Sequence, residues 1–386
     1  MAFPGVTLTA AFPSPEALRT TNHHGSHSHL LADKTTSAMT KVDAIVVPTG
    51  RPVAYLYSAI ALAKHHECTL VLLCSIRSSA YKASRMARAA GVDVIAINMA
   101  DVPANVLPVF ETTTLLHPTK FRRRTDTSEK RNLGLLLAVA IGWDRIIFLD
   151  DDIEVPDPED LSRAAGLLGP YASVGLPIDP IKGFPDNSTV CHAYRDAGGD
   201  QDSFIGGGAL AVGVESFASF FPKIYNEDWF FLFNDNGLRP SARTGKVIQH
   251  RYDPYRDSMR ARSEELGDTL AEGFMWLMDN NQQLAEADYS FWASFLRNRR
   301  RFLEEVMEMV ERKGFAPETR ARMLESLKAA RGRNWVIDPE LCVGFMKKWL
   351  ADRETWRDLV NRTPRPRRAN VDKGLAELGL ILHRYR

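Results

Sequence analysis

Residues 145–152 have the sequence RIIFLDDD, in which a short apolar run ends in three consecutive aspartates. Such a run, bounded by polar residues, is typical of a buried β-strand. Earlier apolar runs occupy residues 44–47, 69–74 and 92–97, with helix-like segments between them. Strands that alternate with helices of about 10–15 residues indicate βαβ units and a parallel sheet. We therefore predict an α/β fold with a Rossmann-like, doubly wound, mostly parallel sheet, whose first half spans residues 41–155.

The rest of the chain divides into three regions. Residues 1–40 are rich in Thr, Ser, Pro, Ala and His without a sustained period, and they are predicted to be a disordered tail. Residues 156–255 form the second half of the α/β domain, and the segment at 177–202 has the composition of a long mobile loop. Residues 256–386 have apolar side chains at helical spacing and are predicted to be a C-terminal helical extension.

The composition is that of an ordinary globular protein. The 386 residues carry a formal charge of +1, and 45% of them are hydrophobic. These values exclude a wholly disordered chain and a basic nucleic-acid coat, so no nucleic-acid partner is expected. The longest apolar stretch, residues 133–143, has 11 residues, whereas a bilayer requires about 20. The absence of a signal-peptide pattern and of any C-x-x-C pair favours a cytoplasmic protein with reduced cysteines.

The aspartate triplet is the first candidate site. In open α/β sheets, ligands bind beyond the carboxyl ends of the strands, which is where Asp150, Asp151 and Asp152 are predicted to lie. Three adjacent carboxylates repel one another unless a cation or abundant water is present. On position alone, a metal site and a solvated acidic turn are equally good interpretations.

Other motifs along the chain favour the metal site. They are Pro48-Thr49-Gly50-Arg51 after the first strand, Lys130-Arg131-Asn132-Leu133-Gly134 before the fourth, Gly206-Gly207-Gly208-Ala209, the acidic pair Glu227-Asp228, and the late histidine His250. In this order and together with the aspartate triplet, they resemble the GT-A fold glycosyltransferases, particularly glycosyltransferase family 2. The resemblance covers roughly residues 42–255.

The resemblance implies a metal-dependent, inverting sugar transfer from a nucleotide-diphosphate donor. Mn²⁺ or Mg²⁺ would bind Asp150, Asp152 and His250, and Asp228 would be the general base. The implied donor-binding residues are Pro48, Thr49, Arg51, Ser75, Arg77, Lys130, Arg131, Asp150 and Asp151. The implied acceptor-binding residues are Gly207, Gly208, Glu227 and Trp229. From the residues alone, Lys130 and Arg131 also fit solvated charges at a helix start, and Glu227-Asp228 fits a helix N-terminus capped by Asn226.

Donor and acceptor are less defined. A UDP-sugar is slightly favoured as the donor, although the chain has Cys74-Ser75-Ile76-Arg77 where family 2 usually has acidic residues that bind the nucleoside. The acceptor is expected to be a soluble small molecule or a peptide. The C-terminal helices are expected to pack on the core as an acceptor-binding or homodimer-forming subdomain rather than as a membrane-surface anchor, and residues 363–386 are expected to be dispensable for solubility.

Three other functions remain open. A phosphatase of the haloacid dehalogenase type also has D-x-D after a strand, but Glu154 stands where its motif usually has Thr or Val. A sugar-phosphate nucleotidylyltransferase shares the fold, but its glycine-rich first loop is absent from residues 48–52. A non-catalytic scaffold would be favoured if Asp228 pointed away from the triplet.

Overall fold

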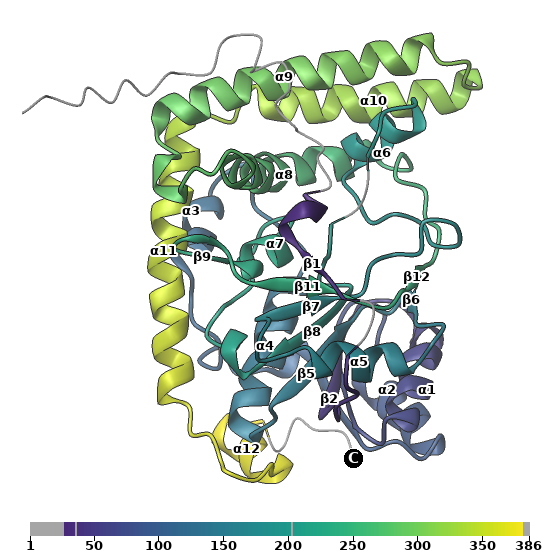
Figure 1. Cartoon of the computed structure of the whole chain (residues 1–386), viewed down its shortest axis with the longest axis vertical. Helices are drawn as coiled ribbons and strands as arrows, with labels where there is room; N and C mark the ends of the chain where they lie inside the picture. The colour runs from purple at the N-terminus through teal and green to yellow at the C-terminus, as the bar shows by residue number, and fades with distance from the viewer. Residues whose placement is uncertain (1–26, 35–36, 202–203, 381–386) are drawn as a thin grey trace, which may run out of the picture.

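The computed structural model describes residues 27–34, 37–201 and 204–380, and its centre is an eight-stranded sheet (Figure 1). The strand order is β1-β11-β7-β8-β5-β2-β3-β4. The strands are β1 (Ala32–Asp33), β2 (Ala44–Thr49), β3 (Thr69–Cys74), β4 (Val94–Asn98), β5 (Arg145–Leu149), β7 (Ser173–Gly175), β8 (Ala209–Gly213) and β11 (Ser241–Arg243). Two short pairs lie outside it: β6 (Ile153–Glu154) with β12 (Ile248–Gln249), and β9 (Phe233–Asn234) with β10 (Gly237–Leu238).

The sheet is mostly parallel, as predicted. Only β8 runs antiparallel to its neighbours β5 and β7 within this sheet. In the central register, Val46 lies opposite Val71 on one side and Phe148 on the other. The four predicted strands of the first half are therefore confirmed, and their carboxyl ends lie at one edge of the sheet.

Helices cover both faces of the sheet. Alternate residues of β2 point to opposite faces, so Ile45 and Val47 contact one apolar cluster and Val46 the other. The first cluster includes residues of α1 (Tyr57–His65), α2 (Ala80–Ala89) and α5 (Glu159–Gly166). The second includes α4 (Thr127–Ile141), which packs so closely that a Cβ on Gly134 would lie 2.8 Å from Cγ1 of Val46.

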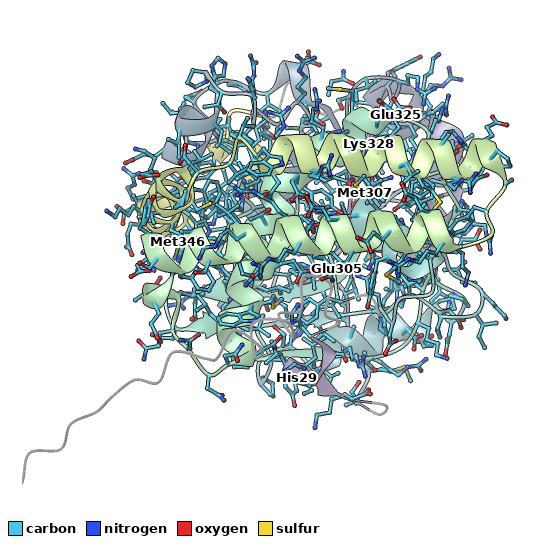
Figure 2. The ribbon with its side chains drawn as sticks, turned by 90° about the horizontal axis from the view of Figure 1, so that it is seen from above. His29, Glu305, Met307, Glu325, Lys328 and Met346 are labelled. Carbon is cyan, nitrogen blue, oxygen red and sulfur yellow. The ribbon has the colours of Figure 1, made fainter. Side chains whose placement is uncertain are left out.

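The C-terminal helices are α8 (Ser258–Asp279), α9 (Tyr289–Arg312), α10 (Pro317–Asn334) and α11 (Pro339–Arg362). Helices α8, α9 and α11 continue the second apolar cluster, whereas the buried apolar side chains of α10 belong to a third. Figure 2 shows α9 and α10 side by side above the rest of the molecule. Phe274 on α8 contacts the rings of Phe230 on α7 (Glu227–Leu232), Trp292 on α9 and Trp349 on α11, with centroid distances of 5.4–5.9 Å. The predicted extension is helical, and its core is continuous with that of the α/β domain.

Three regional predictions need correction. The prediction of a disordered tail is wrong for the described residues 27–34, because β1 pairs with β11 and His27 is buried. The rest of the predicted tail up to residue 26 lies outside the described residues. The predicted loop at 177–202 contains a helix, α6 (Thr189–Asp196), with a buried face. Residues 363–380 are not peripheral, since α12 (Val371–Glu377) packs on α4 and Leu375 is fully buried.

No helix in the described residues is long and apolar enough to cross a membrane. A further short helix, α3 (Glu111–Leu116), lies beside α11, where Asp352 accepts hydrogen bonds from the backbone N–H groups of Glu111 and Thr112.

Candidate active site

A cavity of about 1050 Å³, including its solvent-open mouth, lies beyond the carboxyl end of β5. Its walls come from α4, the glycine segment 206–208, the start of α7, the loop before α6, and α8. Carboxylates dominate the charged lining: Asp150, Asp186, Glu227, Asp228, Asp268 and Glu272 face Arg123 and Arg131. Phe204, Tyr225 and Trp229 add aromatic surface.

Asp150, the first residue after β5, is held at this cavity from two directions. Its N–H donates to the carbonyl of Gly208 at 2.9 Å, and its carboxylate accepts from Nη2 of Arg131 at 3.0 Å. Nη1 of Arg131 donates to Oε1 of Glu227 at 2.7 Å. The buried Arg131 therefore bridges two carboxylates that are 77 residues apart in the sequence (227 − 150).

Asp228 lies on the other side of the glycine segment. Its Oδ2 accepts from the N–H of Gly207 at 2.7 Å, and its Oδ1 accepts from the N–H of Trp229 at 2.9 Å. Asn226, at the N-cap position of α7, has a φ of 60°, which turns the chain so that Glu227 and Asp228 both reach the cavity. Asp228 therefore faces the same cavity as Asp150 and does not point away from it.

The closeness of backbone and side chains makes Gly207 a sensitive position. A Cβ there would lie 2.4 Å from Cζ of Arg131, which is buried and fixed by two ion pairs. We expect Gly207→Ala to lower the free energy of unfolding by roughly 1–3 kcal/mol, because Arg131 must leave its partners. Gly208→Ala is the matched control, since the nearest atom to its Cβ would be Asp150 Oδ2 at an ordinary 3.5 Å. Equal urea-denaturation midpoints for the two variants would contradict this.

The other two aspartates of the triplet pair with a second arginine. Arg51 contacts Asp151 closely through Nη1 and Asp152 at 2.9 Å through Nη2. Thr49, the last residue of β2, donates its hydroxyl to Asp151 at 2.7 Å. Two of the predicted donor-binding residues, Thr49 and Arg51, thus contact the triplet, whereas Pro48 is not among the residues that line the cavity.

Lys130 has a different position from the one predicted. Its buried ammonium donates to the carbonyl of Thr49 at 2.9 Å and to Ser75 Oγ at 2.7 Å, and it pairs with Asp126 at 2.9 Å. All three donors are occupied, so Lys130 joins the ends of β2 and β3 instead of presenting a free charge to a ligand. Arg77 is exposed and does not line the cavity.

The predicted metal ligands are only partly brought together. Asp152 is close enough to Asp150 for its charge to raise the pKa of Asp150, but the His250 ring pairs with Glu154 at 2.7 Å and is half exposed. Within the described ranges, no group of three His, Cys, Asp or Glu side chains is placed to hold a metal. Mg²⁺ commonly uses one or two carboxylates and completes its shell with water and phosphate oxygens. Asp150 and Asp152 fit that pattern, whereas His250 does not.

Burial shapes the titration of the cavity. Desolvation raises the pKa of Asp150 to about 6, against the opposing charge of Arg131. Desolvation also raises the pKa of Glu227 and brings that of Asp186 to about 7, in the latter case with the help of Asp150, Asp228 and Asp152. Asp186 was not predicted from the sequence, yet it lines the cavity and its pKa responds to the charges of Asp150, Asp152 and Asp228.

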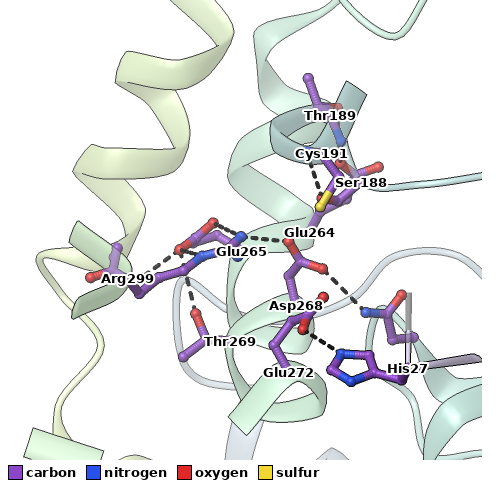
Figure 3. A network of polar contacts seen from close by, with 12 residues as sticks. His27, Ser188, Thr189, Cys191, Glu264, Glu265, Asp268, Thr269, Glu272 and Arg299 are labelled. Carbon is purple, nitrogen blue, oxygen red and sulfur yellow. Dashed lines mark hydrogen bonds and ion pairs between the residues drawn. The ribbon is translucent and has the colours of Figure 1, made fainter. Parts of the chain in front are cut away.

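Helix α8 forms the far wall with a network of buried polar groups (Figure 3). Arg299 on α9, fully buried, bonds Glu265 at 3.1 Å and also Asp268. Glu272 accepts from the His27 ring at 3.1 Å, and the other ring nitrogen lies 2.7 Å from Asp279. The His27 ring packs edge-on against Trp229 at 5.9 Å. The N-terminal segment therefore fixes both α8 and a ring that lines the cavity.

His27 predicts a pH-dependent stability. Burial alone would lower its pKa, but the hydrogen bonds to Asp279 and Glu272 outweigh burial and raise the pKa to about 9, against 6.5 when unfolded. The imidazolium stabilises the fold fully below pH 6.5, and this stabilisation is lost as the pH rises through 9. It corresponds to roughly 3 kcal/mol.

The groups that face His27 are Glu272 and Asp279 of α8, and His29 shares Asp279. Urea denaturation between pH 6.5 and 9.5 should show this loss for the wild type and not for His27→Gln. Parallel curves for the two proteins would contradict the assignment.

Comparisons with known proteins give no match by sequence and a distant similarity by structure. No protein-family model matches it, and no curated protein sequence matches it. Among solved structures, it is similar to the mannosyltransferase PcManGT from Pyrobaculum calidifontis in complex with GDP-Man and Mn²⁺, with 11% identity, a TM-score of 0.36 and 92% of each chain covered. Values this low do not establish a shared fold or function.

Proposed function

We propose that this protein is a GT-A glycosyltransferase, resembling family 2, that moves a sugar from a nucleotide-diphosphate donor to an acceptor hydroxyl with inversion. One observation carries the proposal: motifs that are far apart in the sequence converge on one cavity. Asp150, Arg131, Gly207, Glu227 and Asp228 are linked by direct hydrogen bonds and ion pairs beyond the end of β5. A solvated acidic turn would not require this convergence.

Asp228 is the proposed general base. An inverting transfer requires a carboxylate that takes the acceptor's proton while the acceptor oxygen attacks the anomeric carbon and the bond to the nucleoside diphosphate breaks. The N–H groups of Gly207 and Trp229 fix the orientation of the Asp228 carboxylate, and Trp229 also lines the cavity. With Gly208 and Glu227, these residues form the proposed acceptor side of the cavity.

The donor side is proposed to lie toward Asp150 and Arg51. Arg131 lies at the boundary between the two sides, where its charge counters the carboxylates around it. Mn²⁺ or Mg²⁺ held by Asp150 and Asp152 would neutralise charge on the departing diphosphate. Arg51 follows β2, Ser75 and Arg77 follow β3, and Asp151 follows β5. We propose that these four residues surround the nucleoside.

A donor-binding screen tests the proposal directly. We expect at least one nucleoside diphosphate, from a set that includes UDP and GDP, to raise the melting temperature of the protein more with Mn²⁺ than with EDTA. A soluble small molecule or a peptide remains the proposed acceptor, and a homodimer through the C-terminal helices remains a proposal that sedimentation would test. If no nucleotide of the set raises the melting temperature with Mn²⁺ or with Mg²⁺, the result would count against a nucleotide-sugar enzyme.

A further inference from the structure

A second, smaller pocket adjoins the cavity and has the opposite charge. It has a volume of about 300 Å³ and is lined by Thr113, Leu116, His117, Arg122, Arg123 and Lys223. Among the described residues, no carboxylate contributes to its lining. Lys223 forms a close ion pair with Glu129, outside the lining, which leaves the two arginines as its uncompensated charges.

Arg123 belongs to both spaces. It lines the main cavity as well as the small pocket, and its guanidinium stacks over the Tyr225 ring at 5.4 Å. Its charge also acts on Glu227, next to the proposed base. One side chain therefore contributes to the walls of both spaces, which lie side by side at Arg123.

Two arginines at or near this pocket, Arg123 and Arg333, each have a buried nitrogen without a hydrogen-bond acceptor among the described residues. Nε of Arg123 is buried and has no hydrogen-bond partner in the part of the chain that the structure describes, and Nη1 of Arg333 is in the same state. Arg333 lies over the Phe121 ring at 5.2 Å, one residue from Arg122. Burial and the neighbouring Arg262 lower the pKa of Arg333. A buried guanidinium nitrogen without an acceptor carries a desolvation cost, which an anion bound beside it would offset.

We propose that the pocket formed by Arg122, Arg123 and Lys223 binds an anionic group of the acceptor, a phosphate or a carboxylate, while the acceptor hydroxyl lies in the main cavity. This proposal rests on the proposed sugar transfer and adds the chemical class of the acceptor. Arginine forks suit both oxyanions, because two parallel N–H groups match two oxygens.

The position of the pocket favours the acceptor over the donor diphosphate. Thr113, Leu116 and His117 belong to or follow α3, which lies beside α11 in Figure 1, across the molecule from α1 and α2. Arg51 and Ser75, on the proposed donor side, follow β2 and β3, and α1 and α2 pack on one face of these two strands. Lys223 is instead five residues before Asp228 (228 − 223), on the acceptor side.

A phosphate titration of the full chain tests the pocket. The protein is first saturated with the nucleoside diphosphate that binds best, so that the donor site is filled, and inorganic phosphate is then added at constant ionic strength while the melting temperature is followed. We expect stabilisation of the wild type, and at least a tenfold higher half-saturating phosphate concentration for Arg123→Gln and for Arg122→Gln. Arg122 is exposed, so its variant should fold normally.

Arg124→Gln is the matched control, because it removes one charge from the same loop but lines neither cavity. It should respond to phosphate like the wild type. A parallel titration with acetate distinguishes the two oxyanions, and a response to either supports the pocket. An equal loss in Arg124→Gln, an unchanged response in both pocket variants, or phosphate binding that nucleotide abolishes would overturn it. Nucleotide-sugar hydrolysis by the wild type, measured separately, reports on the proposed function itself.

Discussion

Asp228→Asn should lower the rate of sugar transfer by about 10²–10⁴-fold, because asparagine cannot accept the proton of the attacking hydroxyl. The amide oxygen can still accept the hydrogen bond from the N–H of Gly207, so the glycine segment should keep its position. Steady-state kinetics should therefore show a large fall in kcat, with little change in the concentration of donor that half-saturates the enzyme.

The melting temperature with bound nucleoside diphosphate serves as the control for this variant. An unchanged melting temperature, together with the lost turnover, separates a catalytic defect from a folding defect. Turnover within a factor of about three of the wild type would remove Asp228 from the mechanism, since general-base catalysis typically contributes more than that.

Asp150→Asn is expected to have the second large effect. The carboxylate lines the cavity and is balanced by Arg131. Loss of its charge removes a proposed metal ligand and leaves Arg131 paired with Glu227 alone. Stabilisation of the departing charge by a metal amounts to several kcal/mol, so turnover should fall by about 10³-fold. Mn²⁺-dependent stabilisation by nucleoside diphosphate should disappear as well.

Asp151→Asn is the matched comparison within the same triplet. Asp151 bonds Thr49 and Arg51 and does not line the cavity. Its replacement should therefore reduce turnover less than that of Asp150 and leave the Mn²⁺ effect in place. A reversed order of the two variants would place the metal at Asp151 instead.

The regular elements were accessible from the sequence because local patterns determine them. The apolar runs of β2, β3, β4 and β5 are short and bounded by turns, and each lies in the sheet. The start of α11 also has a local cause, since Asp338 caps the helix by accepting from the N–H of Leu341 at 2.6 Å, with Pro339 in its first turn. The position of Asp150 followed from its place at a strand end, whereas Asp228, on α7, was assigned to the same site through the family resemblance.

The far wall of the cavity was not accessible from the sequence. Asp268 and Glu272 lie on α8 and reach the site only because that helix crosses the strand ends, which depends on the packing of Phe274 among distant aromatic rings. His27 lies 245 residues from Glu272, so no local pattern connects them. A polar residue inside an otherwise apolar helix face was the available signal, and it does not specify a partner.

Lys130 and His250 show the opposite error, in which residue type suggested a ligand. Lys130 lies in the first turns of a helix near the strand ends, but its ammonium is bound by Thr49, Ser75 and Asp126. His250 follows β12, and the pairing of β12 with β6 places its ring beside Glu154. In both cases the direction of the side chain depended on a neighbour that the sequence did not identify.

Release of nucleoside diphosphate from nucleotide sugars tests the central claim most directly. The wild type and Asp228→Asn are incubated with a panel of UDP- and GDP-sugars, with Mn²⁺ or with EDTA, and the free diphosphate is measured over hours. We predict release from at least one donor that requires Mn²⁺ and is strongly reduced in Asp228→Asn. Release that is equal in EDTA and in the variant, or no release from any donor, would contradict a metal-dependent transferase with Asp228 as its base.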